Sequence, residues 1–151
     1  MNASERSDSI PNAASAGWTL TFAAWLIATL STLGSLFLGE VMGYSPCVLC
    51  WYQRIAMFPL VFVLAAGLFP LDPRVVRYVL PLAAVGWGMA LFHLALVAGW
   101  IPESIKTCQA NVPCSDVQVV WFGFVTIPLL SLAAFSLIAA LLLATLRKGS
   151  K

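Results

Sequence analysis

Four long apolar segments take up most of this chain and limit the folds open to it. They cover residues 18–38, 51–69, 79–100 and 124–146. Each is about 20 residues long, which is the length that a helix needs to cross a hydrocarbon core of about 30 Å. Only 9% of the 151 residues are charged, against about 25% in an ordinary soluble domain. The sequence therefore predicts an all-α membrane protein, a bundle of four transmembrane helices.

The basic residues predict how the bundle is oriented. If the chain crosses the membrane four times, Arg54 and Lys106 are the only basic residues toward one side of the membrane, and the other six lie toward the opposite side. The positive-inside rule then predicts that both termini are cytoplasmic and that two short loops face outward. The basic residues do not gather on one face, so a nucleic-acid partner is not indicated. Those on the predicted cytoplasmic side are Arg6, Arg74, Arg77, Arg147, Lys148 and Lys151.

The chain has room for one domain. We expect residues 1–17 to be a flexible cytoplasmic tail, residues 18–146 to be the four-helix transmembrane domain, and residues 147–151 to be a basic cytoplasmic tail. In the first span, Gly34-Ser35 and several alanines predict close helix packing. Residues 116–146 would make a helix of about 46 Å, longer than a bilayer core, so we expect a break at Gly123 and Thr126-Ile-Pro128.

Two cysteine pairs lie on the predicted outward side, Cys47 with Cys50 and Cys108 with Cys114. Disulfides persist in such an oxidising compartment. Structural disulfides would each close only a short loop and gain little stability from it. Zinc could take four thiolates, but neither loop holds a histidine, so we expect no metal. A relay of thiol–disulfide exchange, for which the short loops bring the pairs together, is favoured.

The motif Cys47-Val-Leu-Cys50-Trp-Tyr-Gln-Arg54 opens the second span. Helical spacing puts both cysteines on one face, with Arg54 one turn below Cys50. A cation there would stabilise a Cys50 thiolate and the anionic oxygen of a reduced carbonyl-type acceptor, although an arginine at a helix end also commonly snorkels. Gln53 offers further hydrogen bonds. His93, the only histidine, lies within the third span. There it would either protonate the reduced ring of such an electron acceptor or form a hydrogen bond with a backbone carbonyl.

The CVLCWYQR motif, the outward Cys108/Cys114 pair and the segment Trp121-Phe-Gly-Phe-Val-Thr-Ile-Pro128 resemble the DsbB/BdbC family of bacterial disulfide-bond-formation membrane proteins. The chain is most similar to the short-loop BdbC-like members. The resemblance implies an enzyme of the bacterial cytoplasmic (inner) membrane with its redox cysteines on the extracytoplasmic face. Such an enzyme would reoxidise a soluble thioredoxin-fold dithiol oxidase and pass the electrons to membrane quinone, ubiquinone or menaquinone.

The resemblance also implies residue roles. Cys108 would receive the attack of the partner, Cys114 would exchange with Cys47, and Cys50 would face the quinone beside Arg54. Gln53 and His93 would be further quinone-binding residues. Only five residues separate Cys108 from Cys114, fewer than in DsbB proper, which leaves the order of exchange open.

Two other functions stay open at the level of sequence. One is an enzyme similar to vitamin K epoxide reductase, in which the same chemistry would serve to reduce a quinoid substrate. The other is a non-catalytic or metal-binding membrane scaffold whose disulfides are incidental.

Overall fold

The computed structural model describes residues 3–69, 72, 74–101, 120–121 and 125–149. Within them the chain forms four long helices that are apolar enough to cross a membrane, so the predicted all-α class is confirmed. The first helix, α1, passes directly into a short π-helix, η1. The bounds are α1 Ala3–Leu36, η1 Phe37–Val41, α2 Val48–Leu68, α3 Val75–Val97 and α4 Ile127–Gly149.

Two very short strands add to the predicted helices. β1 (Val120–Trp121) pairs antiparallel with β2 (Val125–Thr126), and α4 begins at the next residue, Ile127. The expected break before the last span is thus confirmed at Thr126-Ile-Pro128. Pro128 stands in the first turn of α4, where its missing N–H costs nothing.

The N-terminal segment differs from the flexible tail expected for residues 1–17, because α1 is helical from Ala3 onward. A helix that already exists needs no new nucleus to grow by a further turn. Ala13, Ala14 and Ala16, residues of the type with the highest helix propensity, favour such an extension.

The four helices form a closed bundle in which α1 packs on α2 and α4, and α3 packs on the same two helices. The centre is filled by fully buried apolar side chains. Gly86 of α3 lets the ring of Phe135 approach closely, since a Cβ at this position would run into that ring. Ala24 and Ala28 of α1 are also fully buried, which confirms their predicted packing role. The largest of the buried side chains are Phe135, Leu60, Leu64, Ile138 and Leu142.

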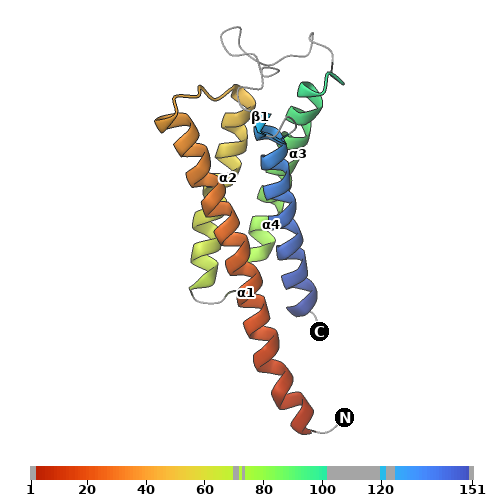
Figure 1. The fold of residues 1–151 in the computed structure, drawn as a ribbon. Coiled ribbons are helices and arrows are strands. Elements are labelled where there is room, and N and C mark those ends of the chain that lie inside the picture. Colours follow the sequence, from red (N-terminus) through yellow and green to blue (C-terminus); the bar gives the residue numbers. More distant parts are fainter. Residues whose placement is uncertain (1–2, 70–71, 73, 102–119, 122–124, 150–151) are drawn as a thin grey trace.

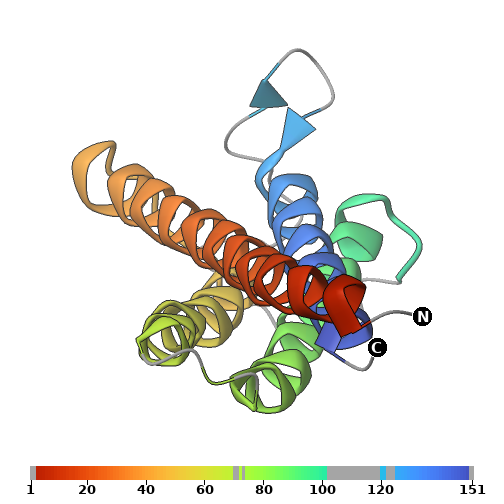
Figure 2. The same ribbon diagram turned by 90° about the horizontal axis from the view of Figure 1, so that it is seen from below.

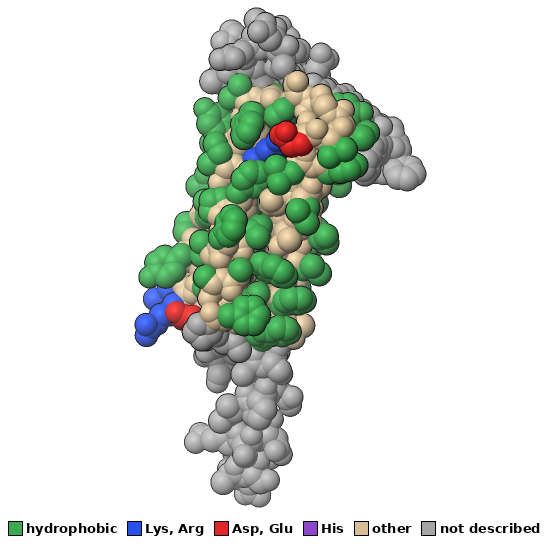
Figure 3. Space-filling model, turned by 90° about the vertical axis from the view of Figure 1, so that its left-hand side faces the viewer, with side chains coloured by type: hydrophobic (Ala, Val, Ile, Leu, Met, Phe, Trp, Pro, Cys, Tyr) green, Lys and Arg blue, Asp and Glu red, His purple; other side chains and the backbone are tan. Residues whose placement is uncertain are grey.

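The bundle has two distinct ends. The start of α1 and the end of α4 lie together at one end, and the start of α2 lies at the other (Figure 1). Seen along the bundle, α1 crosses the other helices obliquely (Figure 2). On the face drawn in Figure 3, charged side chains gather near the two ends of the described surface, with an apolar band between them. This arrangement suits a protein that spans a bilayer.

Candidate redox site at the start of the second helix

A pair of thiols stands where α2 begins. Pro46 precedes Cys47, whose extended backbone (φ −67°, ψ 166°) makes it the N-cap of the helix. The start of α2 at the CxxC motif is as the sequence predicts. Both cysteines are free, their sulfur atoms lie 2.8 Å apart, and the Cys50 N–H donates to Cys47 Sγ at 3.3 Å. The helix end thus holds a dithiol whose two sulfurs are already close enough to interact.

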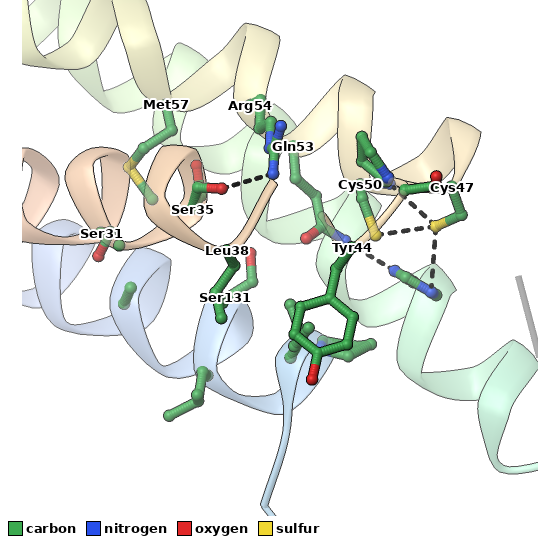
Figure 4. Close-up of a pocket in the computed structure, with 18 of the residues that line it drawn as sticks. Ser31, Ser35, Leu38, Tyr44, Cys47, Cys50, Gln53, Arg54, Met57 and Ser131 are labelled. Atoms are coloured by element: carbon green, nitrogen blue, oxygen red, sulfur yellow. Dashed lines mark hydrogen bonds between the residues drawn. The ribbon is translucent and has the colours of Figure 1, made fainter. Parts of the chain in front are cut away.

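His93 reaches this dithiol from α3. Its Nε2 lies 3.8 Å from Cys47 Sγ, and its Nδ1 lies 3.2 Å from the side-chain nitrogen of Gln53. Gln53 and His93 are 6% and 3% exposed, which leaves them little access to water. An amide, an imidazole and a thiol therefore form one chain of contacts between α2 and α3 (Figure 4).

These contacts favour a thiolate on Cys47. The hydrogen bond from the Cys50 thiol lowers the pKa of Cys47 to about 4, and the contact with His93 acts in the same direction against the opposing effect of burial. A hydrogen bond to the charged form of a group favours that form. The sequence had suggested the thiolate at Cys50, because Arg54 follows it by one helical turn. The structure instead surrounds Cys47 with donors.

Arg54 is held between α2 and the end of α1. Its Nη2 donates to the backbone oxygen of Ser35 at 2.6 Å, and its guanidinium carbon lies 5.6 Å from the centre of the Trp51 ring. A hydrogen bond from a charged donor is shorter and stronger than one between neutral groups. Gly39 leaves space for the group, since a Cβ there would lie 2.9 Å from Nη2. The guanidinium therefore has a fixed position.

The dithiol and Arg54 line one cavity of about 450 Å³. Its walls come from all four helices and from the connection Tyr44-Ser-Pro46, and most of them are apolar (Figure 4). Leu30 of α1 and Leu130 of α4 also line it, although they are 60% and 48% exposed on the outside of the bundle. Because these two residues both line the cavity and face outward, the cavity reaches the side of the bundle between them, where lipid would lie.

Two residues of the cavity wall have a different role from the one that the sequence predicts. Gly34 and Ser35 were expected only to pack against a neighbouring helix, but both line the cavity, together with Ser31 and Ser131. Small residues in a membrane helix predict close approach, and nothing in them distinguishes a helix contact from a cavity wall. The predicted site residues Cys108 and Cys114 lie outside the residues that the structure describes.

The family model and the relatives that match this chain agree on one protein family. The family model described as "Disulfide bond formation protein DsbB" matches residues 17–145. A "Probable disulfide formation protein" of Metapseudomonas resinovorans is 48% identical, over 87% of this chain and 92% of its own. "Disulfide bond formation protein C" of Bacillus subtilis (strain 168) is 45% identical, over 86% and 93%. A "Probable disulfide formation protein" of Deinococcus radiodurans is 44% identical, over 82% and 86%. No solved structure matches the chain.

Proposed function

Because the chain belongs to the DsbB family of disulfide bond formation proteins, and is thus a disulfide-generating membrane oxidoreductase, we propose that it is a protein thiol:quinone oxidoreductase. The resemblance first drawn from CVLCWYQR is confirmed by the family match. In the proposed reaction the protein reoxidises a soluble thioredoxin-fold dithiol oxidase and passes the electrons to membrane quinone. We place it in the bacterial cytoplasmic membrane, with its termini inside and its cysteines outside.

One observation carries the proposal: the Cys47/Cys50 dithiol lines a mainly apolar cavity that also contains Arg54. The volume of about 450 Å³ falls in the range of about 300–1,000 Å³ that is usual for small-molecule sites. A quinone ring is flat and apolar with two carbonyl oxygens, so it needs such walls and a donor at one edge. The sideways opening between Leu30 and Leu130 suits a ligand that is dissolved in lipid.

A quinone bound there would accept two electrons and two protons and leave as quinol. The residues of the chain supply what this requires. Cys47 and Cys50 give up two electrons as their sulfurs join, and Cys50, one helical turn deeper than Cys47, faces the cavity beside Arg54. The Arg54 guanidinium offers N–H groups to a ring oxygen. His93 holds a proton between Cys47 and Gln53, at the buried side of the dithiol.

The second cysteine pair would connect this site to the partner. The partner's thiolate attacks Cys108 of the Cys108–Cys114 disulfide and releases the Cys114 thiolate, which then attacks Cys47 of the Cys47–Cys50 disulfide. The remaining thiols resolve the two mixed disulfides, so that the partner leaves oxidised and Cys47 and Cys50 are left reduced. The place of Cys47 at the very start of α2, outside the span Val48–Leu68, supports its role as the cysteine that meets the loop.

The decisive experiment mixes the purified protein with a reduced CxxC thioredoxin-fold protein and either ubiquinone or menaquinone. We expect the loss of two thiols for each quinol that is formed. Thiol oxidation that does not depend on quinone would overturn the proposal. A residue test follows from the site: Arg54→Ala should raise the KM for quinone far more than the KM for the thiol partner. Arg77→Ala is the matched control, because Arg77 is exposed at the opposite end of the bundle.

A further inference from the structure

Cys47, Cys50 and His93 form a cluster of three groups that can each serve as a metal ligand. We propose that, in the reduced protein, these three residues bind one Zn²⁺ ion and that the bound ion blocks the dithiol. The binding of the ion stands on the geometry alone. Its inhibitory effect rests on the proposed function.

The distances suit a tetrahedral zinc site. The two sulfurs and one ring nitrogen lie within 4.8 Å of one another. With Zn–S bonds of about 2.3 Å and a Zn–N bond of about 2.0–2.1 Å, tetrahedral ligands lie about 3.8 Å apart for two sulfurs and about 3.6 Å apart for sulfur and nitrogen. Cys47 Sγ and His93 Nε2 are 3.8 Å apart, close to that value. The two sulfurs, at 2.8 Å, need to separate by about 1 Å.

The donor atoms also suit zinc. Two thiolates and one imidazole are the protein ligands of a known class of open zinc sites, which keep a fourth position for water or another ligand. Here all three residues line the cavity, which has room for a water molecule as a fourth ligand. Zinc replaces the thiol protons without any change in oxidation state, and both thiolates are then unavailable for exchange. Formation of the Cys47–Cys50 disulfide removes both sulfur ligands, so the site exists only in the reduced protein.

Gln53 supports the histidine ligand. A zinc-bound histidine usually donates its other ring N–H to a protein oxygen. The Gln53 amide lies against His93 Nδ1 at 3.2 Å, and a half-turn of this amide would present its oxygen to an Nδ1–H group. The His93 Nε2 is then free of its proton and able to bind the ion.

This site is not predicted from the sequence, because neither outer loop holds a histidine. His93 lies 46 residues after Cys47 and belongs to a different helix. The packing of α3 on α2 brings it to the thiols. The site therefore differs from the four-cysteine site that the sequence had led us to consider.

Titration of the reduced, detergent-solubilised protein with Zn²⁺ against a chromophoric chelator tests the proposal. We expect one ion per chain in the reduced protein and none at the same affinity after oxidation. Co²⁺ in place of Zn²⁺ should give the absorption of tetrahedral thiolate coordination. A reduced protein that binds no ion, or an oxidised protein that binds equally well, would overturn the site.

Variants separate this site from the four-cysteine alternative. Replacement of both loop cysteines, Cys108→Ser with Cys114→Ser, should leave binding unchanged, and loss of binding in that variant would refute the proposal. His93→Ala should weaken binding by at least about 100-fold and Gln53→Leu by about 10-fold, the scale seen for groups around a metal. His93→Cys supplies a third thiolate and should restore binding, so a fold defect in the alanine variant cannot be mistaken for loss of a ligand.

Activity then tests the consequence. Zinc should inhibit quinone-dependent thiol oxidation, with the inhibition relieved by a chelator. A protein that binds zinc but never oxidises thiols would refute the proposed function and leave the metal site standing. An active enzyme that binds no zinc would do the reverse.

Discussion

Gly39→Ala tests whether the position of Arg54 governs quinone binding. The added Cβ would lie 2.9 Å from Nη2 and 3.1 Å from Nη1 of Arg54, closer than carbon and nitrogen normally approach. The guanidinium is the far end of a flexible side chain, so it will move rather than unfold the helix. Its 2.6 Å hydrogen bond to the Ser35 oxygen ties it to its present place, and that bond is broken when it moves.

The size of the effect follows from the bond that is lost. A hydrogen bond to a charged group contributes about 1.5–3 kcal/mol, and about 1.4 kcal/mol corresponds to a factor of ten in affinity. If the guanidinium must return to its place whenever quinone binds, the KM for quinone should rise about 10- to 100-fold. Global stability should change little, since alanine gains up to about 1 kcal/mol over glycine in a helix.

Steady-state kinetics with varied quinone and saturating thiol partner measure this effect. Gly88→Ala is the matched control, because Gly88 is an exposed glycine of α3 with nothing within 4 Å of an added Cβ. The double variant Gly39→Ala with Arg54→Ala should be no worse than Arg54→Ala alone, as expected when both act through one group. An unchanged KM in Gly39→Ala, or additive effects in the double variant, would refute the reasoning.

Three further outcomes are expected. Gly86→Ala forces a Cβ into the Phe135 ring and should cost about 1–3 kcal/mol of stability, seen as a lower midpoint of thermal unfolding that Gly88→Ala does not share. In a reduced variant without the loop cysteines, and with chelator present, the Cys47 thiolate should persist at neutral pH and be lost as the pH falls through about 4, because the pKa of Cys47 is lowered. The ultraviolet absorbance of the thiolate measures this titration. A midpoint at about 8.5, the ordinary pKa of a cysteine, would contradict the prediction. Leu130→Trp narrows the side opening of the cavity and should raise the KM for quinone, whereas Leu137→Trp, equally lipid-facing but away from the cavity, should not.

The fold was largely predictable because membrane spans obey a simple length rule. Long apolar runs predicted the four helices, and the CxxC motif predicted where the second helix begins, with Cys47 as its N-cap. Two features were not foreseen. The helix at residues 3–17 grows from a span that is already helical, and the pairing of Val120–Trp121 with Val125–Thr126 depends on backbone groups that leave little trace in the sequence.

The site was predictable only in part. Cys47, Cys50 and Arg54 share one motif, so their helical spacing brings them to the same place. The contact of His93 with Cys47 depends on how α3 is rotated against α2, and a single sequence does not record that rotation. The partner of Arg54 is a backbone oxygen of Ser35, which any residue would supply equally well. The identity of a side chain therefore could not have indicated it.

The cavity opens sideways between Leu30 and Leu130. The concentrations of the two substrates of the proposed reaction are therefore defined in different phases. The thiol partner is measured by its amount per volume of water. The acceptor is measured by its mole fraction in a two-dimensional film, since it arrives from within the membrane. Added detergent or lipid would dilute the acceptor without diluting the partner, so turnover should fall as lipid is added at constant total quinone. In a cell, the same geometry makes the rate of disulfide supply follow the composition of the membrane rather than its area.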